Sequence, residues 1–310
     1  MTGPVEVWRG GVNTWDCDEM GHMNVRHYVV RAGEALAGLA CELGMPEAFS
    51  PRAGATLLVR EHHIRFLREA KPGAALHMTG GVVSIGEDEA WLLLQLIHSR
   101  TGEPAATFQV RVAHTTRAGR LFPWPKRVRE AAKALAMEVP PHVAARSVSL
   151  EPVEPTAGLA RAEALGMVRT GRGVIDTTQV DAFGRMRAEQ FIGRVSDGVG
   201  GVVGPIREAV TAALGEAAPK RLGGAVLEYR MLYLDWPRAG DHVALRSGLA
   251  GVDGRTQRLV HWLLDPVSGK AWGTSEAVAV NFDLDTRKIA PISEAAQAAM
   301  RPRIVDGLRL

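Results

Sequence analysis

The sequence predicts an α+β fold that is built twice within one chain. Three observations lead to this prediction: the chain contains an internal repeat, each copy has one long apolar stretch with helical spacing, and several strand-like runs follow each of these stretches. At 310 residues the chain has room for two domains of ordinary size. A hydrophobic content of 46% and a charged content of 23% are typical of a globular protein and exclude disorder as a description of the whole chain.

The internal repeat is seen when the segment around Asp18 is aligned with the segment around Asp181. Chemically similar residues then coincide at the same spacing, and a second block further along the chain keeps the match. We therefore expect the two halves to be diverged copies of one fold. The coinciding pairs are Asp18 with Asp181, Gly21 with Gly184, Met23 with Met186, Tyr28 with Phe191, Glu61 with Glu228 and Phe66 with Tyr233.

Each copy begins with a short strand and a loop that lead into a helix. In the first copy Val5 to Trp8 is predicted as the strand, and apolar residues from Val25 to Leu39 recur at helical spacing. Gly44 indicates where this helix ends. In the second copy we predict a strand over Val174 to Val180 and a helix over Phe191 to Val202.

Four strand-like runs follow each helix, separated by turn signals such as AKPG and RTGEP. An apolar helix followed by consecutive strands predicts a helix covered by an antiparallel sheet, because such a helix is too apolar to lie in water. In the first copy the runs are Thr56 to Leu67, Ala75 to Ser84, Ala90 to His98 and Ala105 to His114. Their counterparts are Ala225 to Leu234, Asp241 to Ala250, Thr256 to Asp265 and Ala271 to Phe282.

These elements predict four parts of the chain. The first unit covers residues 1–121 and the second unit covers residues 166–294. Residues 122–165 form a Pro-rich connector with one short amphipathic helix, KRVREAAKALA, and residues 295–310 form a C-terminal tail.

Charge and cysteine content limit the classes of partner and the compartment. The 37 basic residues are scattered among 34 acidic ones, so nucleic acid is not an expected partner. Two cysteines without a Cys-x-x-Cys pair predict a reducing cytoplasm. The N-terminus lacks a signal-peptide pattern and no apolar run approaches about 18 residues, so neither secretion nor a membrane is expected. No metal or other cofactor is expected, since His62 and His63 alternate between the faces of one strand.

The segment DCDEMGHMNVRHY, which ends at Tyr28, resembles the active-site segment of the 4-hydroxybenzoyl-CoA thioesterase branch of the hotdog-fold family. The shared pattern is an aspartate, a glycine three residues later, a histidine, an asparagine and a tyrosine at the start of the central helix. The order of strand, loop, apolar helix and antiparallel strands also resembles a hotdog unit. The resemblance implies two tandem hotdog units, each an antiparallel sheet wrapped around a long central helix.

Thioester hydrolysis needs a base or nucleophile beside the carbonyl carbon and hydrogen-bond donors for the carbonyl oxygen. The resemblance implies that Asp18 is the catalytic carboxylate, which either attacks the thioester or activates a water. It also implies that His22 and Asn24 orient the reacting groups, while Asp16 is the second choice for the carboxylate.

The same motif supplies the groups expected to bind the thioester. Gly21 lets a thioester approach the backbone closely, because glycine has no side chain. The first amides of the helix, around Asn24 and Val25, are expected to point toward the loop without intrahelical partners and to polarise the thioester oxygen. Tyr28, one helical turn further on, is expected to pack in the substrate slot.

Ordinary structural roles compete with these interpretations. Asp18 has a residue type and a position that also suit an N-terminal helix cap. A lone histidine such as His22 is more often a hydrogen-bonded structural group than a catalyst. Cys17 is expected to pack, because a catalytic cysteine needs an activating base.

The second copy keeps Asp181 and Gly184 but replaces the histidine by Arg185 and the asparagine by Arg187. A second thioesterase site is therefore in doubt. We expect Asp181 to form a structural ion pair with one of these arginines, and the alternative is that the arginines bind substrate phosphate.

In paired hotdogs the helix of one unit faces the motif of the other, so the second helix is expected to contribute to the first site. Gln190 and Asp197 are the candidates, and Glu34 is the repeat mate of Asp197. All three are polar residues on helices that otherwise look apolar, and a buried polar group needs a partner. A hydrogen bond that serves only the fold is an equally good explanation.

The sequence thus predicts a cytoplasmic acyl-CoA thioesterase, a hydrolase acting on a small-molecule acyl-CoA, with one intact site in the first copy. The alternatives are a non-catalytic acyl-CoA binding protein and an acyl-ACP thioesterase. Acyl-ACP thioesterases are expected to place their working residues in the second unit, where this chain departs from the motif. Two fused units already form a pair, so both a monomer and a homodimer are compatible with the sequence.

Overall fold

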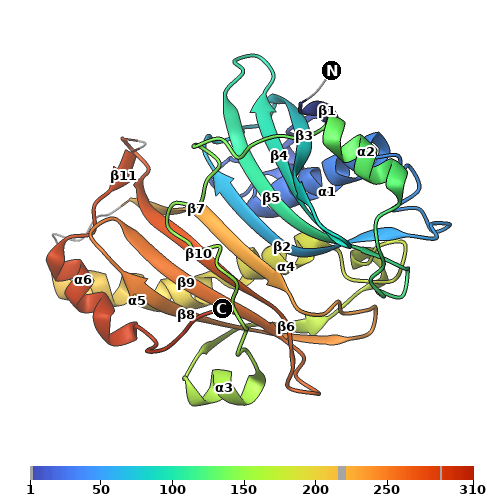
Figure 1. Cartoon of the computed structure of the whole chain (residues 1–310). Coiled ribbons are helices and arrows are strands. Elements are labelled where there is room, and N and C mark those ends of the chain that lie inside the picture. Colours follow the sequence, from blue (N-terminus) through green and yellow to red (C-terminus); the bar gives the residue numbers. More distant parts are fainter. Residues whose placement is uncertain (1–2, 216–220, 287) are drawn as a thin grey trace. The chain divides into compact units, whose positions relative to one another are not determined.

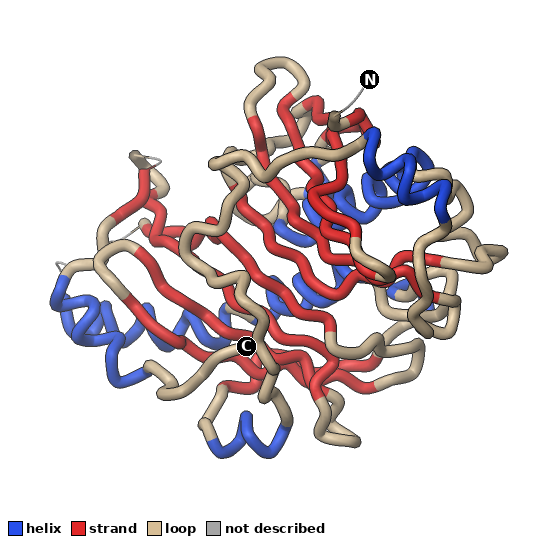
Figure 2. The backbone as a smooth tube through the Cα atoms, in the orientation of Figure 1, coloured by secondary structure: helices blue, strands red, loops and turns tan. Residues whose placement is uncertain are grey.

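The computed structural model describes residues 3–215, 221–286 and 288–310. Two compact units are present. The first contains Met1–Ala145 together with Val180–Gln190, and the second contains Arg146–Gln179 together with Phe191–Leu310. In each unit, strands lie side by side in an antiparallel sheet with helices against it (Figure 2).

The first unit is a helix packed on a five-stranded sheet, as predicted (Figure 1). Its strands lie in the order β1-β3-β4-β5-β2, and every neighbouring pair is antiparallel. Helix α1 (Val25–Glu42) packs against β1, β3 and β4. The strand bounds are Val5–Gly11 for β1, Thr56–Phe66 for β2, Ala75–Ile85 for β3, Glu89–His98 for β4 and Pro104–Thr115 for β5.

Helix α1 is amphipathic, and its apolar face is buried. The buried side chains recur every three or four residues from Tyr28 to Leu39, which is the spacing of one helical face. Gly38 lies so close to β1 that a Cβ atom would collide with the carbonyl oxygen of Val7. Only glycine therefore permits the observed approach of helix and strand.

The other face of this sheet is covered by the connector. His63, Arg65 and Gln109 share that face, because side chains alternate along a strand and His63 is the register partner of Gln109. Arg65 Nη1 donates to the carbonyl of His142 at 2.7 Å, and Gln109 Nε2 donates to the carbonyl of Val143 at 2.9 Å. Polar side chains on the sheet therefore hold the connector backbone.

The second unit repeats the strand order of the first, with β7-β10-β9-β8-β6 in one sheet and β11 beside β10. The equivalence β1 to β6, β2 to β7, β3 to β8, β4 to β9 and β5 to β10 confirms the internal repeat. The bounds are Val168–Val174 for β6, Leu222–Tyr233 for β7, His242–Val252 for β8, Thr256–Leu264 for β9, Ala271–Asp283 for β10 and Lys288–Ala290 for β11.

Two details of the second copy differ from the prediction. The first strand is β6, before Val174, and the predicted strand over 174–180 is wrong. Its sequence VRTGRGV has little apolar pattern, and the edge position beside β8 decides its conformation. The helix extends further than predicted, as α4 (Ala188–Gly198) and α5 (Gly200–Leu214), and Val199 between them keeps helical φ and ψ and donates to the carbonyl of Val195 at 2.8 Å.

Short helical segments also lie outside the central helices of the two copies. Helix α2 (Lys126–Ala134) confirms the predicted connector helix, while α3 (Leu159–Ala164), α6 (Glu294–Met300) and the 3-10 turn Arg301–Arg303 were not predicted. The C-terminal residues pack on the second unit, with Leu308 inside a core cluster around Trp262. Among the described residues, no helix is long and apolar enough to cross a membrane.

We predict that stability falls with acidification because of two buried histidines. Burial lowers the pKa of His62 to about 4 and that of His261 to about 3, whereas an unfolded histidine has a pKa of 6.5. Below pH 6.5 the unfolded chain binds protons that the folded chain excludes, so the free energy of unfolding declines down to each folded pKa. Each histidine should remove about 2 kcal/mol between pH 6.5 and pH 5.

Urea unfolding of His261→Gln at several pH values tests this prediction. Glutamine can keep a hydrogen bond to Ser247 Oγ, which lies 2.8 Å from His261 Nδ1, but it binds no proton. Its stability should depend less steeply on pH than that of the wild type. The control His242→Gln, at an exposed position, should parallel the wild type. If the free energy of unfolding depended equally on pH in all three proteins, the lowered pKa of buried His261 would be refuted.

Candidate active site

The motif forms a tight turn between Asp18 and His22. The amide of Asp18 donates to the carbonyl of His22 at 2.9 Å, and the amide of Gly21 donates to the carbonyl of Asp18 at 3.0 Å. Asp18 Oδ1 accepts from the amides of Met20 at 3.0 Å and His22 at 3.3 Å. Asp18 Oδ2 has no hydrogen-bond partner among the residues that the structure describes. One oxygen therefore fixes the turn and the other is available.

The start of helix α1 lies directly after this turn. Asn24 is the N-cap, and its side-chain oxygen accepts from the amide of Arg26 at 2.9 Å. The cap interpretation of Asp18 is therefore wrong, because Asn24 takes that role. The amide of Asn24 donates to the carbonyl of Asp16 at 2.9 Å, whereas within the described ranges the amide of Val25 has no acceptor. Of the two amides expected to polarise a substrate oxygen, the amide of Val25 is the one that stays available.

His22 and Tyr28 attach the motif to the end of strand β2. His22 Nε2 lies 3.1 Å from Glu69 Oε2, so the imidazole faces Glu69 while its backbone amide serves Asp18. Tyr28 is buried, and its hydroxyl accepts from the amide of Ala70 at 3.2 Å. Its ring packs edge-to-face on Phe66, and burial raises the pKa of Tyr28. Tyr28 thus packs, and the residues around the motif are held by several independent contacts.

Asp16 has a different environment from Asp18. It is only 2% exposed, and its carboxylate lies 3.2 Å from His27 Nδ1 and 3.3 Å from Arg31 Nη2. The amide of Asn13 donates to the same carboxylate at 2.9 Å. Burial, and secondarily the neighbouring arginine side chains, lower the pKa of His27, while Asp16 acts in the opposite direction. Both oxygens of Asp16 are occupied, which makes it a poor substitute for Asp18.

Cys17 lies between the two aspartates. Burial is the main cause that raises the pKa of this thiol, and the two neighbouring carboxylates act in the same direction. A thiol with a raised pKa stays protonated and is a weak nucleophile. The geometry is therefore consistent with packing.

The second copy has the same turn with a different outcome at its aspartate. Gly184 has the φ of +75° seen at Gly21, and Asp181 Oδ1 accepts from the amides of Phe183 and Arg185. Asp181 Oδ2, however, accepts from Arg185 Nε at 3.1 Å. Arg187 lies 3.4 Å from Glu189 instead. The expected structural ion pair forms, and it occupies the oxygen that is available in Asp18.

The candidates from the second helix lie in unlike environments. Gln190 is buried, with 3% exposure, and its amide donates to the carbonyl of Arg187 at 3.0 Å. Asp197 and Glu34 are both exposed, which corrects the expectation that they need buried partners. Each sits on the polar face of its helix, and the sequence suggested a more uniformly apolar helix than the one observed.

Four residues of the site were missed by the sequence analysis. Glu69 contacts His22. The carbonyl of Ala70 accepts from the amide of Met23, and its amide donates to the hydroxyl of Tyr28. The side chains of His27 and Arg31 contact Asp16. For Arg31 a signal existed, because the repeat places Arg194 at the same position. Glu69 carried no signal, since the repeat places Trp236 there.

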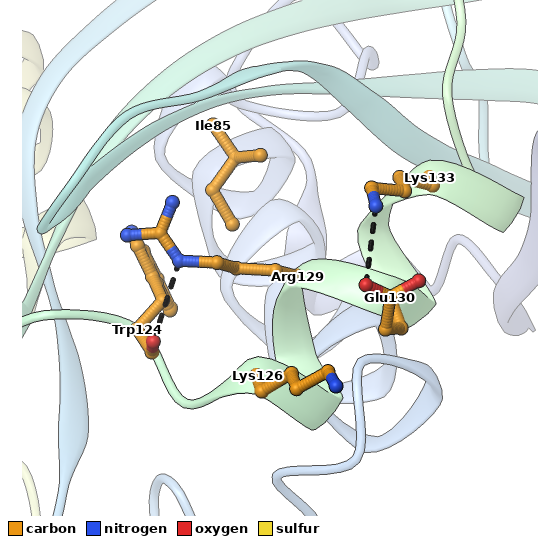
Figure 3. A pocket seen from close by; sticks show the side chains of 6 residues that line it. All are labelled: Ile85, Trp124, Lys126, Arg129, Glu130 and Lys133. Carbon is orange, nitrogen blue, oxygen red and sulfur yellow. Dashed lines mark hydrogen bonds and ion pairs between the residues drawn. The ribbon is translucent and has the colours of Figure 1, made fainter.

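A hollow with a volume of about 470 Å³ lies at the opposite end of strand β3 from the motif (Figure 3). Ten residues of strand, at about 3.3 Å each, separate the two ends of β3 by about 33 Å. Arg129 turns its guanidinium toward backbone carbonyls at this place, donating to Glu87 at 3.0 Å. The lining residues are Ile85, Trp124, Lys126, Arg129, Glu130 and Lys133. No group of three or more metal-ligating side chains occurs in the described part of the chain.

Comparison with known proteins places most of the chain in one family. Residues 12–146 and 175–300 match the model of the thioesterase-like superfamily. The L-carnitine dehydrogenase/betainyl-CoA thioesterase of Rhizobium meliloti (strain 1021) is 29% identical over 136 residues, which are 44% of this chain and 27% of that protein. The match therefore spans about a quarter of that longer relative.

Two solved structures share the fold along nearly the whole chain. The 12:0-ACP thioesterase from Umbellularia californica has a TM-score of 0.64 at 11% identity, covering 88% of this chain and 92% of that chain. An acyl-ACP thioesterase from Bacteroides thetaiotaomicron VPI-5482 has a TM-score of 0.61 at 11% identity, covering 87% and 96%. At these identities the likeness concerns the fold.

We predict that Gly21→Ala and Gly184→Ala each destabilise the protein by roughly 1–2 kcal/mol, because both positions have a φ of +75°, where an L-residue is strained. A methyl group added at Gly21 would meet no atom within 4 Å, so backbone strain is the cost there. Urea unfolding measures the loss. The control Gly33→Ala, at an exposed position of helix α1 without positive φ, should be neutral or stabilising. Equal stability of Gly21→Ala and wild type would contradict the left-handed backbone conformation at Gly21.

Proposed function

The chain belongs to the thioesterase-like superfamily, and we propose that it is a thioester hydrolase of two tandem hotdog units that hydrolyses an acyl-CoA to the free acid and CoA at the Asp18 turn. The observation that carries this proposal is the contrast between the two copies of the turn. Asp18 keeps one carboxylate oxygen without a partner among the described residues, whereas the same oxygen of Asp181 is bound by Arg185.

The chemistry follows from the two groups that remain available. Asp18 Oδ2 attacks the thioester carbon or removes a proton from an attacking water, and the Val25 amide donates to the carbonyl oxygen as negative charge develops there. The helix dipole adds to this stabilisation, because Val25 is the first residue of α1. If Asp18 attacks, the carbon–sulfur bond breaks as an acyl–aspartate anhydride forms, and water then hydrolyses this anhydride and restores Asp18. If a water attacks, the acyl group gains its oxygen directly as the carbon–sulfur bond breaks. In both routes the departing CoA sulfur takes a proton and the acyl group leaves as the free acid.

In this proposal His22 and Asn24 position the reacting groups without reacting themselves. Asn24 caps the helix and so holds the Val25 amide in place. The imidazole of His22 is held by Glu69, and its backbone amide holds Asp18. Gly21 supplies the left-handed turn that brings these groups together.

CoA is favoured over acyl carrier protein as the carrier. The relative with a sequence match is a betainyl-CoA thioesterase, whereas the acyl-ACP thioesterases resemble this chain in fold alone. We expect acyl-ACP thioesterases to work from the second unit, and here that copy has its aspartate in an ion pair. A non-catalytic acyl-CoA binding protein is the second candidate, because the second copy shows that a site in this fold can lose its available carboxylate.

We also propose a cytoplasmic enzyme that acts as a monomer or as a homodimer. Cys17 and Cys41 are both free thiols, which suits a reducing compartment. The acyl group is the substrate feature that the experiment below defines.

We predict that Asp18→Asn lowers kcat by roughly 100-fold or more, because asparagine can neither attack nor accept a proton. Thiol release is measured from short, medium, long and aromatic acyl-CoAs. The matched variant Asp181→Asn loses an ion pair and should lose stability while retaining turnover. Undiminished hydrolysis by Asp18→Asn would refute the role of Asp18, and tight acyl-CoA binding without any thiol release would favour the binding protein.

A further inference from the structure

Asp16, His27 and Arg31 form a polar group, with an ion pair between Asp16 and Arg31, that holds the loop of the motif on helix α1, and we call it the Asp16 network. The Asp16 carboxylate contacts Arg31 at 3.3 Å, His27 at 3.2 Å and the amide of Asn13 at 2.9 Å. The backbone carbonyl of Asp16 also accepts from the amide of Asn24 at 2.9 Å. One buried residue therefore joins the loop before the turn to the first two turns of the helix.

The second copy builds the same connection without an acid or a histidine. Gln179 stands where the repeat places Asp16, and its Oε1 accepts from the amide of Asp176 at 3.0 Å and from Arg194 Nη2 at 3.1 Å. Asp176 and Arg194 are the repeat mates of Asn13 and Arg31, so both hydrogen bonds recur. Gln190 replaces His27. A neutral amide thus satisfies the same donors in the same place.

The comparison of the two copies shows whether the turn needs the negative charge of Asp16. The second copy forms an identical turn, with the same φ at its glycine and the same contacts at its aspartate Oδ1, although its network contains a glutamine. Burying a carboxylate costs more than burying an amide, and an ion pair recovers that cost only in part. The charge of Asp16 is therefore not required for the turn to form, and another benefit must accompany it.

The benefit available is a more rigid position for the catalytic groups. Hydrogen bonds between ionised groups are about twice as strong as neutral ones. The ion pair with Arg31 holds the side chain of Asp16, and the backbone carbonyl of Asp16 accepts from the amide of Asn24, the residue that caps α1 and precedes the Val25 amide. Displacing a reacting group by about 1 Å can cost roughly 100-fold in rate, so a rigid attachment at this point matters for turnover.

We propose that Asp16, supported by His27 and Arg31, is a positioning residue for hydrolysis: its charged contacts hold the Asp18 turn and the Val25 amide in reacting geometry, and the neutral network of the second copy reflects the loss of that task. This inference rests on the proposed function of the Asp18 turn. Asp16 itself touches no reacting atom.

The experiment transfers the residues of the second copy into the first. Asp16→Gln combined with His27→Gln reproduces the Gln179 and Gln190 pair and should fold with a thermal midpoint near that of the wild type. We expect kcat to fall at least ten-fold with KM changed less than two-fold. Combined with Asp18→Asn, the double substitution should cause no further loss, because it acts through Asp18.

Two controls accompany this experiment. Glu34→Gln removes an exposed carboxylate that contacts Arg31 at 3.3 Å and leaves Asp16 in place, so kcat, KM and stability should stay at wild-type values. If the Gln pair unfolds the protein, Asp16→Asn, which keeps the size of the side chain, is measured by the same criteria. A kcat within two-fold of wild type, or a loss that adds fully to that of Asp18→Asn, overturns the proposal.

Amide hydrogen exchange tests the positioning independently of turnover. The amides of Asn24 and Arg26 should exchange faster in the Gln pair than in the wild type or in Glu34→Gln, because Asn24 donates to the loop at Asp16 and Arg26 donates to the Asn24 side chain, so both depend on how firmly Asp16 is held. Unchanged exchange overturns the positioning role. If the wild type releases thiol from no acyl-CoA, the proposed function fails, and faster exchange in the Gln pair still supports the role of the Asp16 network in holding the turn.

Discussion

A helix with a broad apolar face has to be covered, and this constraint shapes both units of the chain. In the first unit α1 meets the constraint by lying against β1, β3 and β4, close enough that Gly38 admits no side chain next to Val7. In the second unit Gly198 approaches the carbonyl of Thr170 in the same manner. Burying a large apolar side chain contributes about 1.5 to 3 kcal/mol, so the many buried residues along α1 dominate its stability.

Fixing the helix also fixes where its N-terminus points, and the chemistry depends on that end. The cap at Asn24 and the contact of Tyr28 with Ala70 hold the first turn of α1 beside the end of β2. A helix held in this way offers an unpaired amide at Val25, which a mobile peptide could not keep oriented. The catalytic potential of the motif is thus a consequence of the packing of α1.

Duplication of this arrangement allowed the two copies to diverge in charge while the backbone stayed the same. The turns at Asp18 and Asp181 share their glycine conformation and their hydrogen bonds, yet Arg185 fills the place of His22 and binds the aspartate. Upstream, Gln179 replaces the buried acid Asp16. Backbone geometry therefore tolerates changes that occupy the carboxylate oxygen left available in Asp18.

Much of the fold could be predicted from the sequence, because its signals are local. Strand runs such as Ala75 to Ser84, bounded by turn residues, were found nearly to the residue, since alternation and glycine turns act over short distances. Strand β6 and the extension of the second helix to Leu214 were missed, because an edge strand of mixed composition and a glycine-rich helix depend on what packs beside them.

The sequence by itself determined the repeat, the helix, the consecutive strands and the presence of an aspartate turn at the helix start, because spacing and turn residues specify all of these. Only the tertiary structure decided which polar groups meet. Asp16 pairs with Arg31 and His27, and His22 pairs with Glu69, because the end of β2 and the face of α1 are brought to the turn by packing of the core. The pairing of His22 with Glu69 leaves no pattern in the order of residues, because Glu69 has Trp236 as its repeat mate.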